Sequence, residues 1–370
     1  MAKFWSKSPV FERKLNESGA FIRRACNLAA LASFALSPSM SIRHPAYPTV
    51  HVAPMMAWTD RHCRYLLRLA SPSAQLFTEM VTTGALLYGK RRRLLDFDPA
   101  EHPVAVQLGG NEPEALATCA RLAAERGYDE VNLNVGCPSS RVQDGEIGAC
   151  LMAQPKRVAD CIAAMREAVD IKVTVKCRLG IDDRDSDEFL DTFIATVAEA
   201  GCQTFYLHAR LALLQGLSPA QNRSVPPLRY ERVYALKQRF PNLRILLNGG
   251  IDSVQGVADA LHHVDGVMIG RAAYHNPLLL ADLHRALLDH SHAVDSFELF
   301  ANYAEYTRRE VQAGTPLKSM TRHLLGLFNG QPGARLYRQV LSDSRRLARN
   351  DPTLLHDAVG MLRRDLSSVA

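Results

Sequence analysis

Short runs of apolar, often β-branched residues alternate along this chain with stretches in which apolar residues recur at helical spacing, from about residue 48 to 290. The short runs predict buried strands, and the longer stretches predict amphipathic helices. The expected strands are Thr49–Ala53, Ala74–Thr78, Val104–Leu108, Glu130–Asn134, Val173–Cys177, Thr204–His208, Arg244–Asn248 and Gly266–Ile269. The expected helices between them include Glu112–Glu125, Pro155–Ala168, Ser186–Ala200, Tyr230–Phe240 and Ser253–Leu261.

These eight β/α units predict an α/β fold, a (β/α)8 TIM barrel over residues 46–290. A doubly wound sheet is the alternative, but no Gly-x-Gly-x-x-Gly pattern follows the first strand, which disfavours a dinucleotide-binding domain. After about residue 290 the strand pattern stops. A small helical domain is expected over 291–370, with helices at Phe297–Ala313, Ser319–Asn329, Ala334–Leu347 and Thr353–Leu366.

Residues 1–45 differ from the rest of the chain. The stretch Phe21–Leu36 is basic at its start and apolar after it, so it superficially resembles a signal sequence. The cysteines downstream read as free thiols, which argues against export. We expect this extension to be disordered or to result from a start codon assigned upstream of the true one, with Met40 as the alternative start.

Polar groups and glycines follow the apolar runs at the point where each expected strand ends. In a (β/α)8 barrel the carboxyl ends of the strands surround one mouth, which is where such enzymes place their functional residues. We therefore expect functional residues around this mouth. They are Pro54-Met55-Met56, Glu79, Gln107, Asn134 with Cys137, Lys176 with Arg178, His208 with Arg210, Asn248-Gly249-Gly250, and Gly270-Arg271.

Cys137 is the most informative of these residues. Gly136 lets the backbone turn sharply after the fourth strand, and Pro138 prevents the strand from continuing. The thiol is therefore expected on a loop at a strand's carboxyl end, where reactive groups are displayed. The alternative for a single cysteine is a small apolar core residue.

Glycines follow the seventh and eighth strands in the segments Asn248–Ile251 and Gly266–Arg271. At these two ends of a barrel, glycines allow backbone N–H groups to approach an anion next to the start of a short helix. The pair predicts a phosphate site, with tight turns alone as the alternative.

Charge and cysteine content narrow the choice of partners. The chain carries a net charge of +6, and residues 301–350 alone hold nine Lys or Arg against three acids, which suits a polyanionic partner or a solvated helical surface. The eight cysteines form no CxxC pair and no zinc-like cluster with histidine, so we expect reduced thiols, a cytoplasmic location and no metal. No apolar stretch approaches the length of a membrane span.

Several longer motifs resemble the tRNA-dihydrouridine synthases. They are APMMAWTD (53–60), VAVQLGG (104–110), VNLNVGCPSSRVQDGEIGACLM (131–152), KCRLGIDD (176–183), LHAR (207–210), NGGI (248–251) and GVMIGRAAYHNP (266–277). Two more resemble the A-type branch of that family, GLSPAQNRSVPPL (216–228) and TRHLLGLFNGQPGARLYR (321–338). The resemblance covers about residues 46–350.

The resemblance implies an FMN enzyme that uses NADPH to reduce uridine in tRNA to 5,6-dihydrouridine, at positions 20 and 20a of the D-loop. It implies that hydride passes from flavin N5 to C6 of the uracil, and that Cys137 then protonates C5 as the general acid. A lysine at the position of Lys176 would stabilise negative charge on the reduced flavin ring. The implied FMN contacts are Ala53, Pro54, Met55, Gln107, Lys176, His208, Asn248, Gly249, Gly250, Gly270 and Arg271.

The same resemblance implies contacts with the RNA. Asn134 would hold the base or its ribose, and Arg210 and Asn222 would contact the substrate. Arg335 and Arg338 are three residues apart on one expected helix, so they share a face, and they match the tail positions where the family contacts tRNA. The family also implies a monomer.

Two other functions remain open from the residues alone. The first is an FMN barrel that acts on a free pyrimidine or small enone, as dihydroorotate dehydrogenases do; it would have no use for a basic helical tail. The second is an RNA-binding module without catalysis. The joint presence of Cys137, Lys176 and Gln107 speaks against that module.

Overall fold

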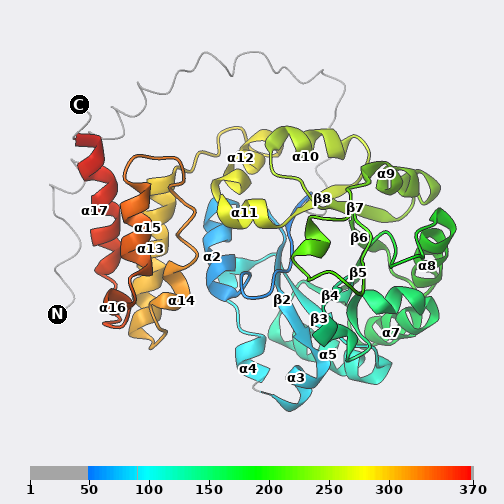
Figure 1. Cartoon of the computed structure of the whole chain (residues 1–370). Helices are drawn as coiled ribbons and strands as arrows, with labels where there is room; N and C mark the ends of the chain where they lie inside the picture. Colours follow the sequence, from blue (N-terminus) through cyan, green and yellow to red (C-terminus); the bar gives the residue numbers. More distant parts are fainter. Residues whose placement is uncertain (1–48, 90, 368–370) are drawn as a thin grey trace. The chain divides into compact units, whose positions relative to one another are not determined.

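A computed structural model describes residues 49–89 and 91–367 of the chain, and the expected 1–45 extension lies outside this range. Eight parallel strands form one sheet in the order β1-β8-β7-β6-β5-β4-β3-β2 (Figure 1). They are β1 (Val50–Val52), β2 (Leu76–Thr82), β3 (Val104–Gly109), β4 (Glu130–Val135), β5 (Lys172–Cys177), β6 (Thr204–His208), β7 (Arg244–Asn248) and β8 (Gly266–Ile269). The expected (β/α)8 barrel is confirmed.

The barrel closes between its first two strands. The amide of Val52 donates to the carbonyl of Gln75 at 2.8 Å, and the amide of Gln75 donates to the carbonyl of Val50 at 3.0 Å. Because Gln75 precedes β2, these two bonds join the open edges of the sheet and satisfy edge groups that would otherwise be unpaired.

The second strand was expected at Ala74–Thr78 but extends from Leu76 to Thr82. Its pairing with β3 shifts register between Phe77 and Met80, which is a bulge. The polar Glu79 interrupts the apolar run in the sequence, yet the strand continues past it because the bulge restores the pairing with β3. This irregularity lies at the mouth of the barrel.

Helices on the outside cover the strands (Figure 1). They are α2 (Arg61–Ala70), α5 (Pro113–Arg126), α7 (Pro155–Ala168), α8 (Asp187–Glu199), α9 (Tyr230–Arg239), α10 (Val254–Leu261) and α12 (Leu278–Leu287). Local signals set their ends. The side chain of Ser186 caps α8 by accepting from the amide of Phe189, and Gly127 ends α5 in a left-handed conformation with φ of 98°.

Side chains alternate between the barrel interior and the surrounding helices. Val131, Leu133 and Val135 on β4 belong to the main apolar core between strands and helices. A separate small cluster fills the barrel itself, with Phe77, Tyr206, Leu246 and Met268 among its members. This two-residue period is why the strand-end predictions could be made from the sequence.

The chain ends in helices α13 (Ser296–Gln312), α14 (Lys318–Thr321), α15 (Ala334–Ser342), α16 (Ser344–Leu347) and α17 (Leu354–Ser367). The expected helix over Ser319–Asn329 is wrong, because α14 ends at Thr321 and turns follow. The expected helix over Ala334–Leu347 is broken at Asp343. The carboxylate of Asp343 accepts from the amides of Arg345 and Arg346, which starts a new helix there.

Polar contacts join α2 of the barrel to these C-terminal helices. His62 Nδ1 lies 2.7 Å from the hydroxyl of Tyr306, and the hydroxyl of Tyr303 donates to the carbonyl of His62 at 3.1 Å. Arg61 pairs with Glu310. The expected boundary between the domains at residue 290 stays a prediction. In the described part of the chain, no helix has the length and apolar character needed to cross a membrane.

Candidate active site

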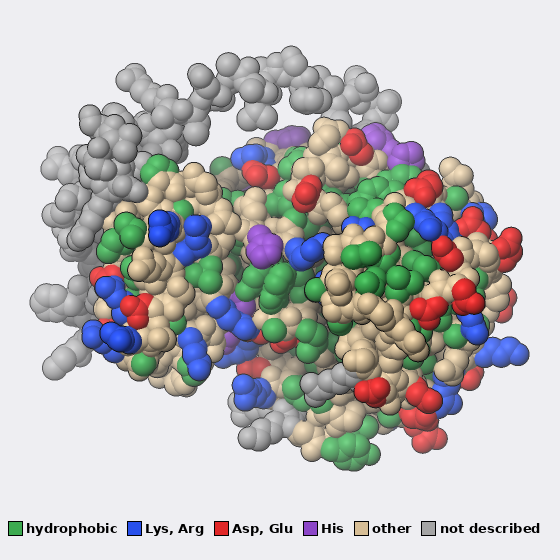
Figure 2. Space-filling model, viewed as in Figure 1, with side chains coloured by type: hydrophobic (Ala, Val, Ile, Leu, Met, Phe, Trp, Pro, Cys, Tyr) green, Lys and Arg blue, Asp and Glu red, His purple; other side chains and the backbone are tan. Residues whose placement is uncertain are grey.

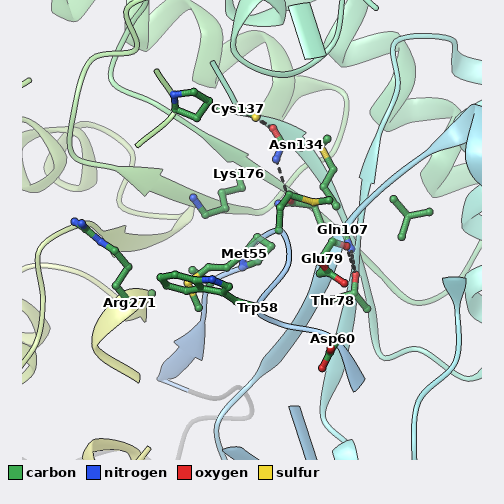
Figure 3. Close-up of a pocket in the computed structure, with 18 of the residues that line it drawn as sticks. Met55, Trp58, Asp60, Thr78, Glu79, Gln107, Asn134, Cys137, Lys176 and Arg271 are labelled. Atoms are coloured by element: carbon green, nitrogen blue, oxygen red, sulfur yellow. Dashed lines mark hydrogen bonds between the residues drawn. The ribbon is translucent and has the colours of Figure 1, made fainter. Parts of the chain in front are cut away.

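A cavity of about 1590 Å³ lies at the carboxyl ends of the strands. Residues at or near the carboxyl end of each of the eight strands contribute to its wall, as expected for the mouth of such a barrel. The wall includes all eleven residues predicted to hold the cofactor, together with Asn134 and Cys137. Figure 3 shows Met55, Gln107, Cys137, Lys176 and Arg271 around one space, although two strands, two loops that follow other strands, and a helix carry them.

The turn that carries Cys137 is held by the side chain of Asn134. Its Oδ1 accepts from the amides of Gly136 at 3.1 Å and Cys137 at 3.0 Å, and the carbonyl of Cys137 accepts from the amide of Ala149 at 2.9 Å. A Cβ at Gly136 would lie 3.3 Å from the carbonyl oxygen of Lys176. The turn therefore packs tightly against β5, and the half-buried thiol of Cys137 faces the cavity from a fixed backbone.

Gln107 is almost fully buried, and its amide is engaged on both sides. Its Oε1 accepts from Nδ2 of Asn134 at 2.8 Å, and its Nε2 donates to Oδ1 of Asn132 at 2.8 Å. Asn132 was not predicted as a site residue. Its signal in the sequence is the alternation of polar with apolar residues along Glu130–Val135, which places Asn132 on the same inward face as Asn134.

Lys176 projects from β5 into the cavity (Figure 3). Burial, and next the charge of Arg178, lower the pKa of its ammonium group to about 7. An anion or a developing negative charge beside this lysine would stabilise its charged form, because that charge offsets the cost of burial. The position therefore suits the electron-rich edge of a reduced ring.

The glycine turns after β7 and β8 line one end of the cavity. Gly249 and Gly250 have φ of 117° and 73°, which favour glycine. A Cβ at Gly250 would lie 2.5 Å from a methyl carbon of Leu228, so a larger residue would displace that side chain. Gly270 precedes α11 (Arg271–His275), and Arg271 lines the same end of the cavity. These residues fit a phosphate group.

His208 stands beside the two glycines. Burial, followed by the nearby charges of Arg178 and Lys176, lowers the pKa of its imidazole well below the usual value, so the ring is neutral near pH 7. Its buried Nδ1 has no hydrogen-bond partner among the described residues. A buried polar atom without a partner is uncommon, and a bound ligand would supply one.

Two arginines also line the cavity: Arg178, which was expected among the polar residues at the strand ends, and Arg223, which was not predicted. Arg178 donates to the carbonyls of Gly136 and Asn222, which ties the Cys137 turn to the loop after β6. Burial lowers the pKa of Arg178 to about 10. Within the described residues, no group of three or more His, Cys, Asp or Glu side chains is arranged to hold a metal ion.

Arg210 and Asn222 do not line the cavity, unlike the other predicted barrel residues. Asn222 is fully buried; its side chain accepts from the amide of Leu213 and donates to the carbonyl of Leu213, both at 2.8 Å. Arg210 donates to the carbonyls of Arg223 and Pro226. Both side chains hold the loop after β6, and their predicted contacts with the substrate stay predictions.

Arg335 and Arg338 lie on α15, away from the cavity wall. The buried face of this helix is formed by Ala334, Tyr337, Val340 and Leu341. Arg335 is exposed, and Arg338 is half-buried and donates to Oδ1 of Asn329 at 2.9 Å. Both side chains therefore lie outside the buried face of the helix, and their three-residue spacing places them on a shared face, as predicted.

The fold and the cavity together define a (β/α)8-barrel enzyme whose site combines a thiol, a buried lysine and glycine turns beside an arginine. Residues 51–361 match the dihydrouridine synthase family, and the chain belongs to that family. It is accordingly an oxidoreductase.

Named relatives cover most of the chain. It is 55% identical over 309 residues to the tRNA-dihydrouridine(20/20a) synthase of Synechocystis sp., which covers 83% of this chain and 92% of the relative. It is 53% identical over 313 residues to the enzyme of the same name from Escherichia coli K12, covering 84% and 90%. A solved structure, a 2-naphthoyl-CoA reductase complex, shares 12% identity with a TM-score of 0.50 over 64% of this chain and 50% of its own, which is a likeness of fold.

Proposed function

We propose that this enzyme reduces uridines 20 and 20a in the D-loop of tRNA to 5,6-dihydrouridine, with FMN as cofactor and NADPH as electron donor. The observation that carries the proposal is the convergence of Cys137, Lys176 and Gln107 on one cavity. At about 1590 Å³ the cavity exceeds the usual size for one small ligand, roughly 300–1,000 Å³, which leaves space for a flavin and an extruded base. The names of the relatives support the substrate and the positions.

The cavity offers groups that suit each part of FMN. Gly249, Gly250, Gly270 and Arg271 would hold the phosphate, with Asn248 and His208 beside them. Lys176 and Gln107 would meet the polar edge of the ring, while Ala53, Pro54 and Met55 would pack against it. When bound, FMN supplies the hydride that adds to C6 of the uracil.

Cys137 supplies the proton in this proposal. The hydride reaches C6 from one face of the base, and C5 then requires a proton, which the Cys137 thiol donates as general acid. The two bonds from Asn134 fix the backbone of the turn and therefore the direction of the thiol. Asn134 also lines the cavity, where its amide can hold the base or ribose.

The target base must leave the folded tRNA to enter the cavity, so the RNA backbone has to be held outside it. Blue Lys and Arg side chains outnumber red acidic ones over the C-terminal helices in Figure 2. Arg335 and Arg338 on α15 present their charges on the outer side of that helix. We assign RNA backbone binding to this surface, and the tRNA substrate favours a cytoplasmic location.

Replacing Cys137 tests the proposed reaction. The variant Cys137→Ala should bind FMN and be reduced by NADPH, because the thiol takes no part in those steps, yet form dihydrouridine in tRNA at least about 10²-fold more slowly. Cys150→Ala is the matched control, since Cys150 is another half-buried thiol that does not line the cavity. A Cys137→Ala enzyme that modifies tRNA at the wild-type rate would remove Cys137 from the reaction.

The cofactor is tested separately. The purified protein should show flavin absorption and release FMN on denaturation. The proposed phosphate site after β7 and β8 suits a mononucleotide, and the sequence disfavours a dinucleotide-binding domain. Chromatography of the released flavin identifies it. Release of FAD, or no flavin uptake on reconstitution, would contradict the assignment.

A further inference from the structure

A line of polar side chains runs down the inside of the barrel below the cavity. Glu130, Asn132 and Asn134 project inward from β4, while the apolar residues between them face the helices. Glu130 lies at the start of the strand, opposite the cavity, and is buried with Asn132. Of these three residues only Asn134 lines the cavity.

Hydrogen bonds join this line into one chain. Asn134 donates to Gln107 and Gln107 donates to Asn132, each at 2.8 Å. Asn132 Nδ2 then donates to the hydroxyl of Thr174 on β5 at 2.8 Å, and that hydroxyl donates to Oε1 of Glu130 at 2.6 Å. The chain begins at the amide of Cys137 and ends at a carboxyl group at the base of the barrel.

The hydrogen bonds of this series all run in one donor-to-acceptor direction, which the groups at its two ends set. Backbone N–H groups can only donate, so the amides of Gly136 and Cys137 require the oxygen of Asn134 to face them. At the other end, the Thr174 oxygen accepts from Asn132, and its single hydroxyl hydrogen is donated to Oε1 of Glu130. An amide that turned around anywhere between these ends would set two donors or two acceptors against each other.

A second hydroxyl, from Tyr206, donates to Glu130 at 3.0 Å. Burial raises the pKa of Glu130, while the hydrogen bonds from Thr174 and Tyr206 and the charges of Lys172 and Arg244 act in the opposite direction. Apolar residues of similar volume would fill the same space without that cost of burial. Burying these polar residues therefore costs more folding free energy than filling the barrel with apolar residues would.

We propose that Glu130 and Thr174 are positioning residues for the Cys137 turn: Glu130 is the terminal acceptor of a chain through Thr174, Asn132, Gln107 and Asn134. Neither Glu130 nor Thr174 reaches the cavity, so both act only through the amides above them. The consequence for tRNA reduction rests on the proposed function, whereas the effect on the backbone of the turn does not.

Two matched pairs of variants test this series of hydrogen bonds. Thr174→Val removes the hydroxyl at nearly constant volume, and Thr174→Ser restores it. Glu130→Met removes the acceptor, whereas Glu130→Gln keeps one oxygen for Thr174 and can donate to Tyr206. Each variant is made as the full-length protein, and its melting temperature is measured first to show that it is folded.

Hydrogen exchange of a peptide that contains Gly136 and Cys137 is the readout that does not need activity. It should quicken roughly five- to tenfold in Thr174→Val and Glu130→Met, the effect of about one weakened hydrogen bond, and should stay near the wild-type rate in Thr174→Ser and Glu130→Gln. A peptide from α15 serves as the internal control. Dihydrouridine formation should fall about tenfold in the first two variants, with reduction by NADPH preserved.

Wild-type exchange and turnover in Thr174→Val would overturn the proposal. So would equal impairment in Glu130→Gln and Glu130→Met, because the charge rather than the acceptor would then be what matters. If the wild-type enzyme forms no dihydrouridine, the proposed function fails. The exchange rates of the Gly136 and Cys137 amides still decide whether the series of hydrogen bonds holds the turn.

Discussion

Lys176 illustrates how one residue serves a site at the expense of the fold. Its ammonium group is enclosed at the end of β5, and burial lowers its pKa from 10.5 to about 7. Below pH 7 the group is charged in the folded and unfolded states, and the folded state bears the full cost of burying it. Between about pH 7 and 10.5 the folded state binds fewer protons than the unfolded one, so stability rises with pH.

Lys176→Met should therefore stabilise the cofactor-free protein most at or below pH 7, by roughly 2–4 kcal/mol, and progressively less as pH rises towards 10. The same variant should bind FMN more weakly, because a bound anionic group compensates the wild-type lysine. Thermal unfolding at pH 6 and pH 9 measures the first effect. Lys156→Met, at an exposed position on α7, is the control and should not show this pH dependence. A gain that grew with pH would contradict the assigned burial.

Cys137 and Cys150 show why residue type alone does not define a role. Both are half-buried thiols close in sequence, but Cys150 donates to the carbonyl of Ile147 and does not line the cavity. Cys137 lies on a turn whose amides are bound by Asn134. The turn, rather than the thiol, distinguishes the proposed proton donor.

At the scale of elements, α15 lies outside the cavity, so the RNA binding proposed for it is separate from the chemistry. Its buried face packs within the C-terminal segment, where Tyr337 donates to the carbonyl of Leu324 at 3.0 Å. Its outer side carries Arg335 and Arg338. A helix that is anchored on one face can present charges on the other without any part in the cavity.

The double variant Arg335→Ala/Arg338→Ala should bind tRNA more weakly and with a shallower dependence on salt, by about one unit of log–log slope for each phosphate that the variant no longer neutralises. FMN binding and reduction by NADPH should not change. Titration with tRNA at several salt concentrations measures the slope. Arg121→Ala/Arg126→Ala on α5 removes the same charge from an outer barrel helix and should have less effect. Equal effects of the two double variants would leave no special role for α15.

At the scale of the whole molecule, Asp60 joins the barrel to the C-terminal helices. It caps α2 by accepting from the amides of His62 and Cys63, and it pairs with Arg322 and with His323 Nε2 at 3.0 Å. Burial alone would raise the pKa of Asp60, but His323, the Cys63 amide and Arg322 outweigh burial and hold the pKa well below its usual value. The stability from this carboxylate is present above its unfolded pKa and is lost as pH falls through the folded value.

Asp60→Ala should lower the free energy of unfolding near pH 7 by about 2–3 kcal/mol, because it removes a helix cap and leaves two basic side chains without their carboxylate. Denaturant unfolding measures the difference. Asp282→Ala, which breaks the exposed pair with Arg285, is the control and should cost less than about 1 kcal/mol. Equal destabilisation by the two variants would show that the Asp60 contacts do not stabilise the folded chain.

Much of this molecule follows from local pattern. The boundaries of β6, β7 and β8 were predicted to the residue, because buried strands between amphipathic helices have a strong signal in the sequence. The cavity wall was predicted for the same reason: residues at strand ends must meet at one mouth once the barrel closes. The turns after Thr321 and at Asp343 were missed. At Asp343 the reason is side-chain capping, which competes with a helical pattern.

The sequence by itself determined the barrel, the loop position of Cys137 and the residues around the mouth, because strand period and turn residues act over a few positions. Only the tertiary structure decided which groups meet across long separations. The bond between Glu130 and Thr174, the pairing of Asp60 with Arg322, and the burial of Asn222 are examples. Such contacts depend on how strands and helices pack, and no local pattern encodes the partner of a buried polar side chain.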